Sequence, residues 1–107
     1  MAAVDRQQQT TEEASCCERL GQVFKALGHP TRLAILRRAM GDEMCVGDLQ
    51  ECLGCSQPNI SQHLAVLRDR GLVVPERDGN RVCYRLTDRR IADLLRSAQE
   101  VFGRAGP

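Results

Sequence analysis

The stretch Cys55–Gly71, CSQPNISQHLAVLRDRG, constrains the fold more than any other part of the chain. Ile60, Leu64 and Leu67 recur at helical spacing, so one edge of a helix here can pack inward. Ser56 stands immediately before this helix, where a serine N-cap is favoured. The polar side chains left to face outward are Gln57, Asn59, Ser61 and Gln62. Because such groups hydrogen-bond to base edges and phosphates, the pattern predicts a helix that contacts DNA.

Two strand-like segments follow this helix, at residues 72–74 and 81–86, and Arg77-Asp78-Gly79-Asn80 between them supplies the turn of a hairpin. On the second strand, alternation places Val82, Tyr84 and Leu86 on one face and Arg81, Cys83 and Arg85 on the other. The arginine face can therefore lie along a phosphate backbone. The hairpin is interpreted as a wing whose DNA-contacting residues are Arg77, Arg81 and Arg85.

Apolar periodicity predicts further helices over about residues 16–27, 30–40, 46–53 and 88–102. Residues 1–14 are polar without periodicity, which predicts a flexible arm, and residues 103–107 form a tail. The expected fold is mainly α with a small β-hairpin, a winged helix-turn-helix domain over residues 15–102.

Size and charge narrow the class of protein. A chain of 107 residues buries only a modest core by itself, and the apolar stripe of the last helix needs a covering surface, so we expect a homodimer. That stripe consists of Ile91, Leu94, Leu95, Ala98 and Phe102.

Net charge is only +1, but residues 56–90 hold seven arginines and four acidic residues, so positive charge gathers on the DNA-contacting half. Without an apolar stretch long enough to span a bilayer or a signal peptide, the chain is expected in the cytoplasm, with no membrane partner.

Three long segments resemble the arsenic- and metal-responsive repressors of the ArsR/SmtB type. They are FKALGHPTRLAILRRA at 24–39, CVGDLQECLGCSQPNISQHLAVLRDRGLV at 45–73 and DGNRVCYRLTD at 78–88. The resemblance covers about residues 17–98. It implies a homodimeric repressor that occludes double-stranded promoter DNA until an effector binds. It also implies that the helix after Ser56 enters the major groove while the wings hold the flanking backbone.

The same resemblance points to a metal site built from thiolates. Similar arsenic sensors often carry Cys-Val-Cys-Asp-Leu at the start of the third helix, whereas this chain has Gly47 in place of the second cysteine. Some similar sensors complete the site with cysteines from the N-terminal arm of the same or the other subunit. The resemblance therefore implies Cys16, Cys17 and Cys45 as ligands. Three soft thiolates suit As(III), the expected effector, and leave Sb(III), Cd(II) and Pb(II) as alternatives.

The other cysteines and the histidines are less promising ligands. Cys52 and Cys55 stand where the family usually has apolar residues, so core packing is expected for both, with Cys55 the less improbable ligand. Cys83, remote in sequence, is the poorest candidate. His29 is expected to cap the second helix and His63 to contact DNA, and neither has a histidine or carboxylate partner at ligand spacing.

Redox sensing is the rival hypothesis to metal binding. Oxidation or persulfidation would link two thiols among Cys16, Cys17, Cys45, Cys52 and Cys55 and shift DNA binding without a metal. A catalytic dithiol enzyme is not expected, because the Cys-x-x-Cys at 52–55 lacks a thioredoxin-like context and a second catalytic group. The sequence predicts a transcriptional repressor and not an enzyme.

Overall fold

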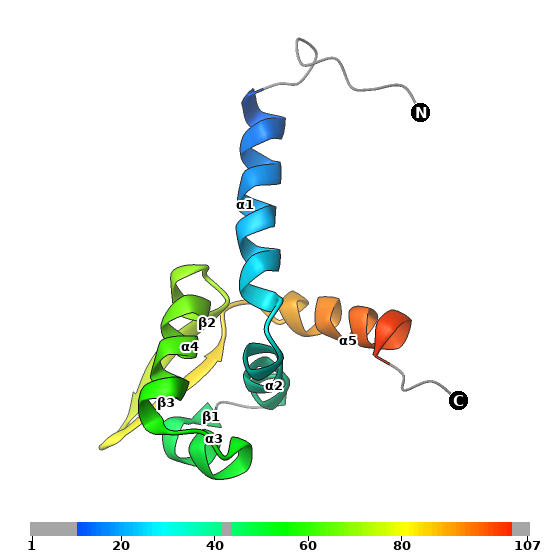
Figure 1. The fold of residues 1–107 in the computed structure, drawn as a ribbon. Helices are drawn as coiled ribbons and strands as arrows, with labels where there is room; N and C mark the ends of the chain where they lie inside the picture. The colour runs from blue at the N-terminus through cyan, green and yellow to red at the C-terminus, as the bar shows by residue number, and fades with distance from the viewer. Residues whose placement is uncertain (1–10, 42–43, 104–107) are drawn as a thin grey trace.

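Helices and a three-stranded antiparallel sheet make up the computed structural model, which describes residues 11–41 and 44–103 (Figure 1). In chain order the elements are α1 (Thr11–Leu27), α2 (Pro30–Ala39), β1 (Met44–Cys45), α3 (Val46–Leu53), α4 (Gln57–Asp69), β2 (Val73–Asp78), β3 (Arg81–Leu86) and α5 (Arg90–Phe102). Helices α3 and α4 form the helix-turn-helix, and β2 and β3 form the wing. The expected winged helix-turn-helix is confirmed.

Local hydrogen bonds set the ends of the helices. The Ser56 hydroxyl accepts a hydrogen bond from the Asn59 N–H at 3.3 Å, which makes Ser56 the N-cap of α4 as expected. His29 caps α2 in the same way, because its Nδ1 accepts from the Thr31 N–H at 3.1 Å. The expected start of the last helix at Asp88 was two residues early. Helix α5 begins at Arg90 after the N-cap residue Arg89, and the Asp88 carboxylate just before it accepts a hydrogen bond from the Arg90 N–H at 2.8 Å.

The sheet has the strand order β1-β3-β2, so β3 lies in the middle. Strand β1 pairs Met44 with Tyr84 and Cys45 with Cys83. This strand was not predicted, because two residues are too short to display an alternating pattern. Its consequence is that the start of α3 is joined directly to the centre of the wing.

The core forms where the apolar edge of α4 meets α2 and the inner face of the sheet. As predicted, Ile60, Leu64 and Leu67 are buried, and they pack with Ile35 and Leu36 of α2 and with other buried residues. The largest side chains at the centre of this core are Ile35, Leu36, Leu49, Ile60, Leu64, Leu67 and Val73.

Helices α1 and α5 extend away from this core in two directions (Figure 1). Within α1 only Ala26 and Leu27, at its C-terminal end, are buried. Helix α1 begins at Thr11, so residues 11–14 of the predicted arm are helical, whereas residues 1–10 and the tail from 104 lie outside the described residues.

An apolar surface is left uncovered on the two extended helices. Large exposed apolar side chains on α1, α2 and α5 are Leu20, Phe24, Leu33, Leu94, Val101 and Phe102. Of the α5 stripe, Leu95 is buried within the single chain while Phe102 is 84% exposed. Among the described residues, no helix is long and apolar enough to cross a membrane.

Replacement of Ile35 by alanine should lower the free energy of unfolding by about 2–5 kcal/mol, because a fully buried side chain leaves a cavity in a close-packed core. Urea unfolding followed by circular dichroism measures the change. Val66→Ala on the exposed side of α4 is the matched control and should cost far less. Equal losses in the two variants would contradict this account of the core.

Candidate functional site

The outer edge of α4 carries the side chains that the sequence assigned to DNA contact. Gln57, Asn59, Ser61 and Gln62 are all exposed, on a helix whose opposite edge is buried, and the N-cap Ser56 is exposed with them. Because Ile60, Leu64 and Leu67 hold the helix in the core, the polar edge has a fixed direction. The wing lies beside the same helix (Figure 1). This arrangement presents a helix of major-groove size next to a basic hairpin.

The wing arginines are exposed, and two of them form ion pairs. Arg81 Nη2 lies 3.0 Å from a carboxylate oxygen of Asp48 on α3, and Arg85 Nε lies 2.6 Å from a carboxylate oxygen of Glu76 on β2. Arg77 is also exposed. Exposed ion pairs contribute at most about 1 kcal/mol, so a phosphate can replace either carboxylate at small cost.

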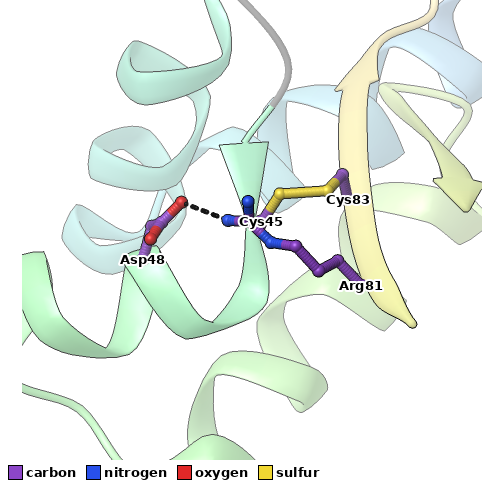
Figure 2. Close-up of a disulfide and its surroundings, with 4 residues drawn as sticks. All are labelled: Cys45, Asp48, Arg81 and Cys83. Carbon is purple, nitrogen blue, oxygen red and sulfur yellow. Dashed lines mark hydrogen bonds and ion pairs between the residues drawn. A yellow bond between two sulfur atoms is a disulfide. The ribbon is translucent and has the colours of Figure 1, made fainter. Parts of the chain in front are cut away.

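A disulfide between Cys45 and Cys83 lies beside Arg81 (Figure 2). Cys45 is the N-cap residue of α3 and Cys83 is at the centre of β3, and their Cα atoms are 3.9 Å apart. Both are buried, Cys83 completely. From the sequence, Cys83 was considered only as a metal ligand, and this pairing was not predicted. Although 38 positions separate the two cysteines in sequence, strand pairing brings Cys83 to Cys45.

The predicted metal ligands are not brought together within one chain. Cys16 and Cys17 are exposed on α1, whereas Cys45 is buried in its disulfide at the far end of the molecule (Figure 1). Within residues 11–41 and 44–103, no group of three or more histidine, cysteine or acidic side chains is arranged to hold a metal ion. A three-thiolate site of Cys16, Cys17 and Cys45 does not fit a single subunit in this state.

The Cys-x-x-Cys pair divides between surface and turn. Cys52 was expected in the core but is exposed on α3, since Leu49 and Leu53 already occupy the inward positions of that short helix. Cys55 is half-buried, packs against the core and donates a hydrogen bond from Sγ to the Leu53 carbonyl at 3.6 Å. For Cys55 the expected packing role is confirmed.

His29 and His63 form a pair that the sequence did not reveal. Their ring centroids are 4.5 Å apart, although 34 positions separate the two histidines in sequence. His63 is half-buried on α4. Partial burial, followed by the charges of His29 and Arg32, lowers the pKa of His63 below its usual range. This environment, between the cap of α2 and helix α4, favours the neutral form of His63.

Comparisons with known proteins agree with this geometry. Residues 29–74 match the family model described as bacterial regulatory protein, arsR family. A biofilm growth-associated repressor of Xylella fastidiosa is 35% identical over 78% of this chain and 73% of its own length. A probable mercury resistance operon repressor of Streptomyces lividans is 37% identical over 83% of this chain and 73% of its own length.

One solved structure also carries information on assembly. The homodimeric winged helix-turn-helix DNA-binding domain of Mb0332 from Mycobacterium bovis superposes with a TM-score of 0.80. It is 30% identical and covers 94% of this chain and 89% of its own.

The lowered pKa of His63 makes a prediction about pH. The unfolded chain binds a proton on this histidine near its ordinary pKa of about 6.5, whereas the folded chain resists it. Stability from this source is complete above about pH 6.5 and is lost as pH falls toward the lowered pKa. His63→Gln should therefore flatten the fall in unfolding free energy between pH 7.5 and 5.5, measured by urea titration. Identical slopes in wild type and variant would contradict the assignment.

Proposed function

Because the chain belongs to the arsR family of bacterial regulatory proteins, a family of DNA-binding repressors and not of enzymes, we propose that it is a repressor whose promoter affinity is set by the redox state of Cys45 and Cys83. The observation that carries this proposal is the position of the disulfide, which links the first residue of the helix-turn-helix to the middle of the wing. Both parts contact DNA in a winged helix-turn-helix.

The DNA contacts are assigned from exposure and position. The N-terminal half of α4 supplies groups for base edges and phosphates, and the wing supplies charge for the backbone. The proposed contact residues are Ser56, Gln57, Asn59, Ser61, Gln62, His63, Arg77, Arg81 and Arg85. His63 contributes mainly by its position against His29, since its side chain is partly buried.

The disulfide is proposed to weaken DNA binding. With the bond closed, β3 is held against the start of α3, and Arg81 is within 3.0 Å of Asp48 (Figure 2). This ion pair neutralises the Arg81 charge that would otherwise bind a backbone phosphate. In the reduced protein no covalent bond holds the junction, and the exposed ion pair is weak by itself, so Arg81 can leave Asp48 for a phosphate. The reduced form is therefore the repressor, and oxidation releases the promoter.

A homodimer completes the DNA-binding unit. The uncovered apolar side chains of α1 and α5 are what a second copy would bury, and Mb0332, which shares the fold, is homodimeric. Two copies place two α4 helices on successive half-sites of the promoter.

Soft metals are a second candidate effector, favoured by the mercury resistance repressor among the relatives. Reduction of the disulfide frees the Cys45 thiolate, and thiolates bind thiophilic ions. Because α1 and α3 lie apart in one chain, a site of Cys16, Cys17 and Cys45 for As(III), Sb(III), Cd(II) or Pb(II) requires the α1 helix of a second subunit.

Reduced protein should bind a labelled duplex from upstream of its own gene roughly 5- to 150-fold more tightly than oxidised protein, the usual range of coupling between two sites. Fluorescence anisotropy at fixed salt measures both affinities, and intact mass confirms the redox state.

Two cysteine variants test whether this pair is responsible. Cys83→Ser should keep the reduced affinity after peroxide or persulfide treatment, whereas Cys52→Ser, which alters an exposed cysteine outside the pair, should switch like wild type. Equal affinity in the two redox states would refute the proposal. A different outcome is that arsenite releases reduced protein from the duplex at a concentration below the one at which a persulfide acts. If Cys16→Ser/Cys17→Ser abolished that release, the metal mechanism would replace the redox proposal.

Leu94→Glu should weaken the homodimer, because it places a charge in the apolar surface of α5 that the second copy covers. Sedimentation velocity without DNA should show a shift toward monomer at micromolar concentration. Val82→Glu alters an equally exposed apolar residue on the wing and should leave the dimer intact. A dimer unaffected by Leu94→Glu would place the interface elsewhere.

A further inference from the structure

A groove of about 620 Å³ lies between α4 and the wing, and Cys45, one of the two disulfide cysteines, is among its lining residues. Cys45 and Gly47 contribute the floor near the start of α3. The walls are one side of α4 and the tip and inner strand of the wing, through Gln57, Ser61, Leu64, Ala65, Arg68, Asn80, Arg81, Val82 and Tyr84. Only one of the two disulfide sulfurs belongs to a residue that lines this space.

The two ends of the disulfide differ in access. Cys45 is 8% exposed and lines the groove, whereas Cys83 is 0% exposed and does not. A nucleophile that enters the groove therefore reaches residue Cys45 and not residue Cys83. Since thiol–disulfide exchange requires direct attack on one sulfur, access decides which sulfur is attacked.

Charge in the groove selects the kind of nucleophile. Arg68 and Arg81 line it, and no aspartate or glutamate is among its lining residues in the described part of the chain. Both arginines have an acidic partner outside the lining: Asp69 lies 3.9 Å from Arg68, and Asp48 lies 3.0 Å from Arg81. The side chains that face the groove itself are therefore basic or uncharged. An anionic molecule is favoured over a cationic one of the same size.

We infer that the groove between α4 and the wing admits a low-molecular-weight anionic thiol, which reduces the disulfide by attack on Cys45. This inference rests on the proposed redox function and names the co-reactant that restores the repressor.

The exchange balances in two steps. The thiolate of the small thiol forms a bond to Sγ of Cys45, the Cys45–Cys83 bond breaks, and Sγ of Cys83 leaves with the electron pair and takes a proton from water. A second thiolate then attacks the small thiol's sulfur in the mixed disulfide, and Cys45 leaves as a thiolate. The protein gains two electrons, and two small thiols become one disulfide.

Promoter DNA closes the same entrance. Gln57, Ser61 and Arg81 line the groove and are also proposed DNA contacts. A duplex on α4 and the wing therefore excludes the small thiol, so exchange proceeds on the free protein.

Three thiols of similar size test the charge preference on full-length oxidised protein: 2-mercaptoethanesulfonate, 2-mercaptoethanol and cysteamine. Rates of disulfide loss, normalised to thiolate concentration and corrected for thiol pKa, should fall in that order at low salt. The normalised rate should change about threefold for each unit of charge on the thiol, as expected for an arginine charge some 6 Å away in water. This difference in rate should shrink as salt is added. Equal rates for the three thiols would overturn the charge argument.

Arginine variants locate the charge. Arg68→Gln should reduce the difference in the rate of disulfide loss between the anionic and the cationic thiol. Arg96→Gln on α5 removes an equal charge away from the groove and should leave this difference unchanged. The same narrowing in both variants would refute a groove-specific effect.

The site of attack is tested with reciprocal variants and the symmetrical disulfide of 2-mercaptoethanesulfonate. Cys83→Ser should form a mixed disulfide at Cys45, and Cys45→Ser should label Cys83 much more slowly, as located by peptide mass spectrometry. Acid-quenched wild-type protein should likewise carry the adduct on Cys45. An adduct mainly on Cys83 would overturn the inference.

Protection by DNA completes the test. A saturating promoter duplex at low salt should slow reduction of wild-type protein by 2-mercaptoethanesulfonate at least severalfold, and an unchanged rate would contradict the shared entrance. The proposed function is tested independently of the exchange rates: it fails if the oxidised and reduced proteins bind DNA with equal affinity.

Discussion

The packing of α4 against α2 and the wing is the contact on which the rest of the structure depends. A helix of 13 residues is marginal alone in water, so its stability comes from burying Ile60, Leu64 and Leu67. Because this edge is fixed in the core, the polar edge of α4 points outward in one direction. The same packing sets the distance between α4 and the wing, and therefore the width of the groove between them.

Features encoded locally could be predicted from the sequence. The spacing of the apolar residues in α4, the serine at position 56 and the turn residues before Arg81 each act within a few residues of chain, and the corresponding elements are present. The outward direction of Gln57 and Asn59 followed from the same periodicity. Only the arrangement of these elements in space depends on contacts between distant parts of the chain.

Features that depend on distant pairing were missed. Strand β1 is two residues long, which is too short for its sequence to indicate a strand or to predict that Cys45 lies opposite Cys83. The ring contact between His29 and His63 likewise joins α4 to the cap of α2, and each histidine looks isolated in the sequence.

Short elements also limited the prediction. Cys52 was misplaced for a related reason: in a helix of only eight residues, one turn cannot decide which edge faces inward. The expected metal ligands came from family resemblance alone, and that likeness does not specify which thiols meet in space.

In the proposed switch, the Cys45–Cys83 disulfide lies close to the groups proposed to contact DNA, so coupling between them needs no long path through the protein. Cys83 is two residues from Arg81 along β3, and Cys45 is three residues from Asp48 at the start of α3. Closing the disulfide brings the same two segments together that the Arg81–Asp48 ion pair joins. An exposed ion pair alone is weak, but a covalent bond beside it raises the effective concentration of one partner around the other. In the proposed switch, Asp48 and a DNA phosphate compete for the guanidinium of Arg81, and the disulfide favours Asp48.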